Sequence, residues 1–335
     1  MTEYTIRPST LRERLVINEQ AQKFPIILDE VQKVPSILDE VHWLIENTNM
    51  NFILCGSSAR KLIKNQSNLL GGRAWRYEMF PLVYPEVDDY SLLQALTRGL
   101  IPSHYTQTQY KKSLKAYCND YLKEEVFNEG LTRNIPAFSR FFESLGYSHG
   151  EMTNYANIAR ECGIDAKTVK EYYQILIDTL LGYFVLPYKK KQSRQVITKT
   201  PKFYLFDVGI AGHLTKRHLT ELKGDQFGRA FEHLIFLEIN AYRSLNDLDF
   251  TINYWRTKTG IEVDFILGDA ETAIEVKGKN RIDNKDLRGL KTFAEEYKSK
   301  QLIIVCNENE PRQVDNILIL PWKSFFEKLW ADEII

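Results

Sequence analysis

The sequence has few cysteines, no net charge and no long apolar run, and each absence excludes a class of protein. Its four cysteines include no Cys-x-x-Cys pair, so we expect reduced thiols rather than a disulfide framework or a zinc site. Basic and acidic residues balance at 44 each, so nucleic acid could be bound only through a local basic patch. The longest apolar run, at residues 175–187, is interrupted by Asp178 and is too short for a bilayer. We therefore expect a cytoplasmic protein without a membrane segment.

Two short strands in the C-terminal third are predicted to present a set of charged side chains. Residues 261–267 and 272–277 alternate apolar and polar side chains between glycine-containing turns. Side chains two residues apart share one face of a strand. The polar face then carries Glu262, Asp264, Glu275 and Lys277. The apolar face carries Val263, Phe265, Ile274 and Val276.

This polar face suggests metal-dependent hydrolysis of phosphodiesters. Neighbouring carboxylates repel one another unless a cation or a proton lies between them, and their hard oxygens suit Mg²⁺ or Mn²⁺. Asp264 and Glu275 are the predicted metal ligands, and Glu275 is expected to be partly exposed. Lys277 would orient a water or stabilise charge on a phosphate. The alternative is an ordinary charged face of a half-exposed sheet.

The N-terminal third contains an apolar strand that ends in two acidic residues, Asp29 and Glu30. In P-loop ATPases such an aspartate organises Mg²⁺ and such a glutamate polarises the attacking water. A second apolar strand, residues 51–55, leads to Ser58, which is a candidate sensor of the nucleotide, and Arg73 could lie near the nucleotide. The alternative is that the acidic pair simply ends a strand.

No GxxxxGK[ST] sequence precedes this strand or occurs elsewhere in the chain. That loop supplies the N–H groups and the lysine that hold the phosphates. The segment before Pro25 is also too short for the strand, loop and helix that such a sheet places first. We therefore expect no ATP binding or hydrolysis by this chain alone, unless a companion chain supplies the loop.

The middle of the chain predicts two helices, residues 154–163 and 166–181, joined by a tight turn and followed by a strand pair. This order fits a winged helix-turn-helix. The hairpin at 188–202 has no acid, and its basic side chains are Lys189, Lys190, Lys191, Arg194, Lys199 and Lys202. Such side chains suit phosphate contacts with DNA or another nucleic acid. The alternatives are a solvated hairpin and a winged helix that packs against protein.

Two resemblances follow from these motifs. Asp264, ten intervening residues and Glu275-x-Lys277 resemble the PD-(D/E)XK nuclease motif, in which Glu232 of an upstream helix would be the fourth acid. Nearly the whole chain also resembles a prokaryotic family of predicted AAA+ ATPases with a C-terminal domain of unknown function. The segments that carry this second resemblance are Ile27–Pro35, Phe52–Arg60, Gly72–Ala74, Phe203–Gly209, Gly228–Glu232, Tyr254–Thr257, Glu262–Phe265 and Glu275–Lys277.

The resemblance implies an α/β protein of three parts. Residues 1–100 would form an AAA-type P-loop domain truncated before its P-loop, residues 101–215 a helical region with the winged helix-turn-helix, and residues 216–335 a restriction-endonuclease-like α/β domain. Asp29, Glu30, Ser58 and Arg73 would belong to the nucleotide site, and Glu232, Asp264, Glu275 and Lys277 to the nuclease-like site. Neither the oligomeric state nor the form of the nucleic acid follows from the family.

Three functions stay open at this point. The first is a nucleic-acid-associated protein with a Mg²⁺- or Mn²⁺-dependent nuclease site. The second is a non-catalytic remnant of an ATP-binding switch, which acts through its winged helix on DNA or on a protein partner. The third is a DNA-binding regulator without catalysis.

Overall fold

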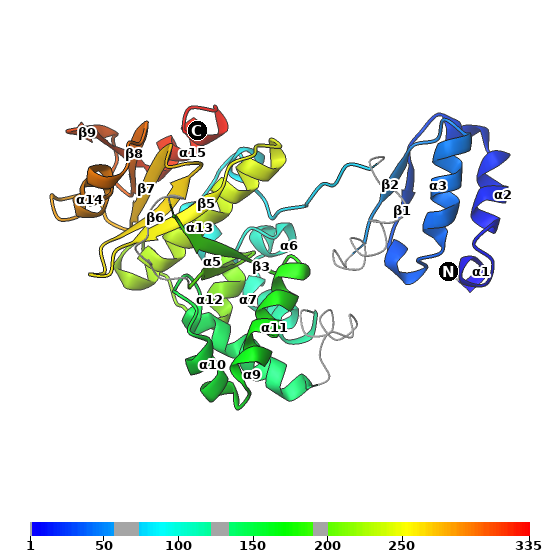
Figure 1. Cartoon of the computed structure of the whole chain (residues 1–335), viewed down its shortest axis with the longest axis horizontal. Coiled ribbons are helices and arrows are strands. Elements are labelled where there is room, and N and C mark those ends of the chain that lie inside the picture. The colour runs from blue at the N-terminus through cyan, green and yellow to red at the C-terminus, as the bar shows by residue number, and fades with distance from the viewer. Residues whose placement is uncertain (1, 57–73, 122–133, 190–199) are drawn as a thin grey trace. The chain divides into compact units, whose positions relative to one another are not determined.

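A computed structural model describes residues 2–56, 74–121, 134–189 and 200–335 (Figure 1). The predicted site residues Ser58, Arg73, Lys190, Lys191 and Arg194 lie outside these ranges. The chain divides into two compact units, residues 1–77 with 178–180 and residues 78–177 with 181–335. The predicted α/β class is confirmed. None of the helices within the described ranges is long and apolar enough to cross a membrane.

The first unit is a small α/β layer. Its elements are α1 (Thr2–Ile6), α2 (Thr10–Val16), η1 (Glu19–Gln22), β1 (Ile26–Leu28), η2 (Val31–Lys33), α3 (Ile37–Asn47) and β2 (Phe52–Leu54). In α3, Ile37, Val41 and Leu44 recur at helical spacing and are buried. β1 and β2 run parallel, with Ile27 opposite Ile53. The two apolar strands that the sequence predicted are therefore neighbours.

In the second unit, eight of the described strands form one mixed sheet in the order β4-β3-β5-β6-β7-β8-β10-β9. Their bounds are β3 (Gly182–Pro187), β4 (Lys202–Leu205), β5 (Ile252–Arg256), β6 (Glu262–Leu267), β7 (Thr272–Lys277), β8 (Gln301–Cys306), β9 (Arg312–Val314) and β10 (Ile317–Pro321). β5, β6 and β7 pair antiparallel, whereas β7, β8 and β10 run parallel. The β3–β4 hairpin joins the sheet because β3 pairs in parallel with β5.

Helices cover both faces of this sheet (Figure 1). They include α13 (Gly224–Leu245), α14 (Arg288–Glu296) and α15 (Trp322–Trp330). On one face, Phe231 of α13 shares a core with Phe265 of β6. On the other face, Leu290 of α14 shares a core with Val263, also of β6. Because both faces are buried, strands such as β8 consist almost entirely of apolar residues.

A helical layer packs on the β3–β4 end of the sheet. The remaining described helices and turns of the unit are η3 (Tyr84–Glu86), α5 (Leu92–Arg98), α6 (Pro102–Thr106), α7 (Tyr110–Ala116), η4 (Tyr117–Tyr121), α9 (Ile135–Ser148), α10 (Tyr155–Cys162), α11 (Ala166–Asp178) and α12 (Val208–Leu214). The turn between α10 and α11 has the glycine that ends one helix and the aspartate that caps the next, as the sequence predicted. Gly163 ends α10 in the left-handed conformation, and the Asp165 carboxylate accepts hydrogen bonds from the N–H groups of Lys167 and Thr168. The two helices and the strand pair that the sequence predicted are present.

Asp207 ties α5 to α12 in the interior of the second unit. Its carboxylate accepts hydrogen bonds from Leu100 N at 2.7 Å and from Gly209 N and Ile210 N at 2.9 Å. Burial raises the pKa of this carboxyl above its ordinary value. Gly99 has a φ of +78°, and a Cβ there would lie 2.2 Å from the Asp207 Oδ1. The contact therefore requires glycine at position 99.

We predict that Gly99→Ala destabilises the protein more than Gly224→Ala does. Gly224 has the same φ of +78°, but nothing lies within 4 Å of its added Cβ. Backbone strain should cost about 1–3 kcal/mol at either position. At Gly99, displacement of Asp207 should add about 1–3 kcal/mol for its broken hydrogen bonds. Denaturant unfolding of both variants measures the difference, and equal losses of stability would contradict the role given to Asp207.

Candidate active site

The strand β6 is irregular beside Asp264. Two steps along β5, from Asn253 to Trp255, correspond to three steps along β6, from Ile266 to Val263. The extra residue makes a β-bulge, a feature that bends a strand and redirects its side chains. The Asp264 Oδ2 accepts a hydrogen bond from the Val276 N–H of β7 at 2.8 Å. The bulge thus places a carboxylate where the backbone pairing of β6 with β7 ends.

The bulge also changes which side chains share a face. Val263 lies in the core beneath α14, whereas Phe265, Ile274 and Val276 lie in the core beneath α13. The single apolar face predicted from strict alternation is therefore wrong at Val263. The extra residue in β6 reverses the alternation on one side of Asp264.

The helix α13 comes close to the end of β7 and brings Glu232 with it. A Cβ on Gly278, which follows β7, would lie 2.8 Å from the Gly228 Cα and 3.0 Å from the Phe227 ring. Glycine at position 278 permits this approach. Glu232 lies four residues after Gly228 and so on the same side of the helix. The close contact therefore directs Glu232 toward the end of the sheet.

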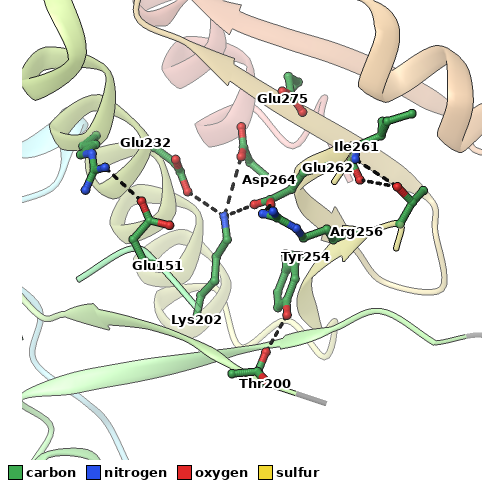
Figure 2. Close-up of polar contacts among 12 residues, drawn as sticks. Glu151, Thr200, Lys202, Glu232, Tyr254, Arg256, Ile261, Glu262, Asp264 and Glu275 are labelled. Atoms are coloured by element: carbon green, nitrogen blue, oxygen red, sulfur yellow. Dashed lines mark hydrogen bonds and ion pairs between the residues drawn. The ribbon is translucent and has the colours of Figure 1, made fainter. Parts of the chain in front are cut away.

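The strand β4 supplies a cation to these acids. Lys202 is only 4% exposed. Its Nζ lies 3.2 Å from Glu232 Oε1 and 3.9 Å from Asp264 Oδ1, and it forms an ion pair with Glu262 Oε1 (Figure 2). It also lies 5.5 Å from the centroid of the Tyr254 ring. Carboxylates from α13 and β6 thus share one ammonium group.

A second lysine pairs with Glu275. Lys277 Nζ donates to Glu275 Oε1, while Oε2 is buried and has no hydrogen-bond partner within the described part of the chain. Glu275 is 6% exposed, so the prediction that it is partly exposed is wrong. The reason is α14: a Cβ on Gly289 would lie 2.4 Å from the Glu262 carbonyl oxygen and 3.4 Å from Glu275 Oε2. The small residue lets this helix cover the carboxyl.

Burial and repulsion shift the pKa values of this cluster. Burial, with the carboxylates of Glu275 and Glu232, raises the pKa of Asp264 well above its ordinary value. Burial raises the pKa of Glu275 to about 7, although the Lys277 ammonium opposes this. Burial also disfavours the charged lysines, but Glu232 raises the pKa of Lys202, and Glu275 that of Lys277, above the ordinary range. The lysines therefore stay charged near neutral pH, while protonation of Asp264 and Glu275 is easier than in an exposed carboxyl.

Whether this site could hold a metal ion depends on which side chains can act as its ligands. In the described ranges, no three histidine, cysteine, aspartate or glutamate side chains are arranged to hold a metal ion. Asp264 and Glu275 offer two buried carboxyl groups on adjacent strands, and the Glu275 Oε2 lacks a partner. Mg²⁺ is commonly held by one or two carboxylates, with water and substrate phosphates completing its shell. The residues therefore fit a metal of this kind.

The predicted residues of the nucleotide site belong to the first unit. Asp29 and Glu30 directly follow β1. The Asp29 Oδ1 accepts a hydrogen bond from Glu30 N at 2.9 Å. Glu30 has a φ of +56° and forms an ion pair with Lys33 at 2.7 Å. In the second unit, Lys189 of the basic hairpin is exposed just after β3.

Sequence reasoning missed the place of Lys202. It assigned this lysine to the phosphate-binding hairpin, but the side chain is buried among carboxylates, so that assignment is wrong. One signal was available. Lys202 directly precedes Phe203, Tyr204 and Leu205, an apolar strand predicted to be buried. A lysine at the start of such a strand needs a buried partner.

Comparisons with known proteins match three successive segments of the chain. Residues 3–87 match an AAA domain, residues 89–221 a domain of unknown function (DUF8612) and residues 227–325 another domain of unknown function (DUF4143). Two uncharacterized proteins, Mb2031c of Mycobacterium bovis and Rv2008c of Mycobacterium tuberculosis, are each 24% identical over 222 residues.

Those alignments cover 64% of this chain and 48% of each relative, so the chain spans about half the length of the curated relatives it matches. No solved structure gives a significant match. The chain is therefore similar to AAA domains over residues 3–87 and to DUF4143 domains over residues 227–325.

Proposed function

We propose that the second unit hydrolyses phosphodiester bonds of nucleic acid with Mg²⁺ or Mn²⁺. The observation that supports this proposal best is the burial of Asp264 and Glu275 on adjacent strands, with Lys277 paired to Glu275. Burying carboxylates together costs free energy, and such clusters with shifted pKa values are concentrated at functional sites. The proposal rests on this cluster and not on the fold.

Asp264 and Glu275 are the residues that would hold the metal. When bound, such a metal polarises a phosphoryl oxygen and lowers the pKa of a water. The Val276 N–H fixes the Asp264 carboxylate, so this ligand is oriented in advance. Lys277 would stabilise charge on a phosphate. Glu232 accepts hydrogen bonds from Lys202 Nζ and, at 2.5 Å, from the Tyr204 hydroxyl, which suits an orienting role.

We predict that Glu275→Gln lowers metal-dependent cleavage by at least about 100-fold, because an amide is a poorer metal ligand than a carboxylate. Glutamine keeps the buried volume, whereas Glu275→Ala would leave a cavity and an unpaired lysine, at a cost of about 3–5 kcal/mol. Nicking of plasmid and cleavage of single strands in Mg²⁺ or Mn²⁺ measure the effect. Equal cleavage by Glu275→Gln would refute the site.

Glu238→Gln is the matched control for this experiment. Glu238 is also a buried glutamate of the same unit, and it accepts hydrogen bonds at 2.7 Å from Tyr84 N and Trp330 Nε1. Burial raises its pKa to about 7, so a neutral side chain is tolerated there. Cleavage should be unchanged in this variant. If the unmodified protein cleaves none of the substrates, the nuclease proposal itself is wrong.

We further predict that replacing Lys189, Lys190 and Lys191 with alanine weakens binding to DNA. Each duplex phosphate that the variant no longer neutralises should make the slope of log K against log salt shallower by about 0.9. The control removes the same charge from the exposed lysines at the α14 side, Lys291, Lys298 and Lys300. Fluorescence anisotropy over a salt series measures both. A hairpin variant with the original slope would show that this hairpin does not touch phosphate.

The first unit favours a second candidate function, nucleotide binding completed by another chain. Ile27 is 66% exposed and Ile53, its partner in the parallel pair, 48% exposed. Parallel strands are normally covered on both faces. β1 leads directly to Asp29 and Glu30, so a chain that carries a P-loop strand and helix would cover this face and complete a phosphate site.

For this candidate we predict that the chain alone binds no ATP in the presence of Mg²⁺. The physical reason is that the sequence lacks the loop whose N–H groups and lysine hold the phosphates. Calorimetric titration with ATP tests this, with Asp29→Asn as the paired variant. Binding by the chain alone that disappears in Asp29→Asn would show that no second chain is needed.

A further inference from the structure

We propose that the segment from β7 to the start of α14, residues 278–288, binds the phosphate groups of a nucleic-acid strand beside the candidate active site. Its exposed bases Arg281, Lys285 and Arg288 would contact the backbone of that strand. The inference rests on the proposed function in its choice of ligand. Its readout is binding without divalent metal, so a failure to cleave nucleic acid leaves it standing.

The first argument is the position of this segment. It begins directly after Lys277, which pairs with Glu275. It leads into α14, where a Cβ on Gly289 would lie 2.4 Å from the Glu262 carbonyl oxygen and 3.4 Å from Glu275 Oε2. Burial lowers the pKa of Lys277, but Glu275 and, more weakly, Asp286 of the segment raise it above the ordinary range. A strand held on this segment would therefore lie beside the carboxyl groups of the candidate active site.

The second argument is a local excess of positive charge in a chain that has no net charge. Basic and acidic residues number 44 each in the whole sequence, whereas residues 277–288 hold five bases and two acids. A patch of this kind can attract a phosphate backbone although the protein as a whole is neutral. The five bases are Lys277, Lys279, Arg281, Lys285 and Arg288.

The third argument is that both acids of the segment are engaged within it. The Asp286 carboxyl group is buried and accepts hydrogen bonds from Lys279 Nζ at 2.6 Å and from the Asp283 N–H at 3.0 Å. The Asp283 carboxylate accepts a hydrogen bond from the Lys285 N–H at 2.8 Å. The acids therefore hold the backbone and one lysine of the segment in place.

Three exposed bases are left for a ligand. Within the described ranges, the side chains of Arg281, Lys285 and Arg288 form no ion pair and no hydrogen bond. Arg281 lies near Glu308, but Arg312 already pairs with that carboxylate at 2.8 Å. Phosphate groups would therefore pair with these bases without displacing an internal partner.

The fourth argument is that the backbone of the segment is fixed before a ligand binds. Ile282 is buried, its N–H donates to Glu308 Oε1 at 2.6 Å, and its carbonyl accepts a hydrogen bond from Arg312 Nη2 at 2.9 Å. The Asn307 N–H donates to the Lys279 carbonyl at 2.9 Å. Side chains on a fixed backbone bind a strand at a lower cost in ordering than side chains on a free loop.

The test replaces Arg281, Lys285 and Arg288 together with glutamine and measures binding of a labelled DNA duplex, and of one of its strands, by fluorescence anisotropy in EDTA over a salt series. We expect at least about tenfold weaker binding at low salt. If each base neutralises one phosphate, the slope of log K against log salt becomes shallower by about 2.7 for the duplex or about 2.1 for the single strand. An unchanged slope for both overturns the proposal, as does absence of binding by the unmodified protein.

Two controls separate this surface from general charge and from the chemistry. Glutamine in place of the exposed lysines of α7 removes the same charge elsewhere in the unit and should leave the slope unchanged; an equal loss there overturns the proposal. Glu275→Gln should bind DNA like the unmodified protein, because Glu275 is not part of the surface. If polyglutamate displaces the DNA as well as unlabelled DNA does at equal charge, the segment recognises negative charge alone, and the proposal is overturned. The lysines of α7 are Lys111, Lys112 and Lys115.

Discussion

Repulsion among four carboxylates at one buried end of a sheet is the constraint on which the second unit depends. Each of these acids contacts or lies near a base. The three bases come from three strands, with Lys202 from β4, Lys277 from β7 and Arg256 from β5. Without these cations the acids could not stay ionised in the interior. The requirement also explains why the β3–β4 hairpin belongs to the sheet, because its lysine completes the charge balance.

Local sequence patterns were sufficient to predict those parts of the site whose residues lie close together in the chain. Alternation and glycine turns predicted β6 and β7, and pairing of these neighbours brings Asp264 near Glu275 and Lys277. The helices before and after Gly163 were predicted from the residues that cap their ends, and these residues also lie close together in the chain. Each of these signals depends on residues only a few positions apart.

The features that sequence reasoning missed depend on contacts between distant segments. The bulge at Asp264 is a single extra residue that becomes visible only when β5 is laid beside β6. The glycine at position 278 is evident in the sequence, but its partner, Gly228, is not. The burial of Lys202 requires β3 to pair with β5, and no local pattern reports that pairing. Lys202 was therefore assigned to the surface, because it belongs to a segment with several other basic residues.

The pairing of β3 with β5 has a consequence for how the chain folds. Leu186 pairs with Asn253, 67 positions later, so this edge of the sheet closes across α12 and α13. Parallel pairing over such a separation is slow, because the entropy of loop closure opposes it before any stabilising interaction forms. Until β3 pairs with β5, Lys202 and the carboxylates that it contacts in the native state remain hydrated and separated. Interactions that form after the rate-limiting step slow unfolding and leave the folding rate unchanged. Ion pairs of Lys202 that form only after that step would lengthen the lifetime of the native state without changing the folding rate.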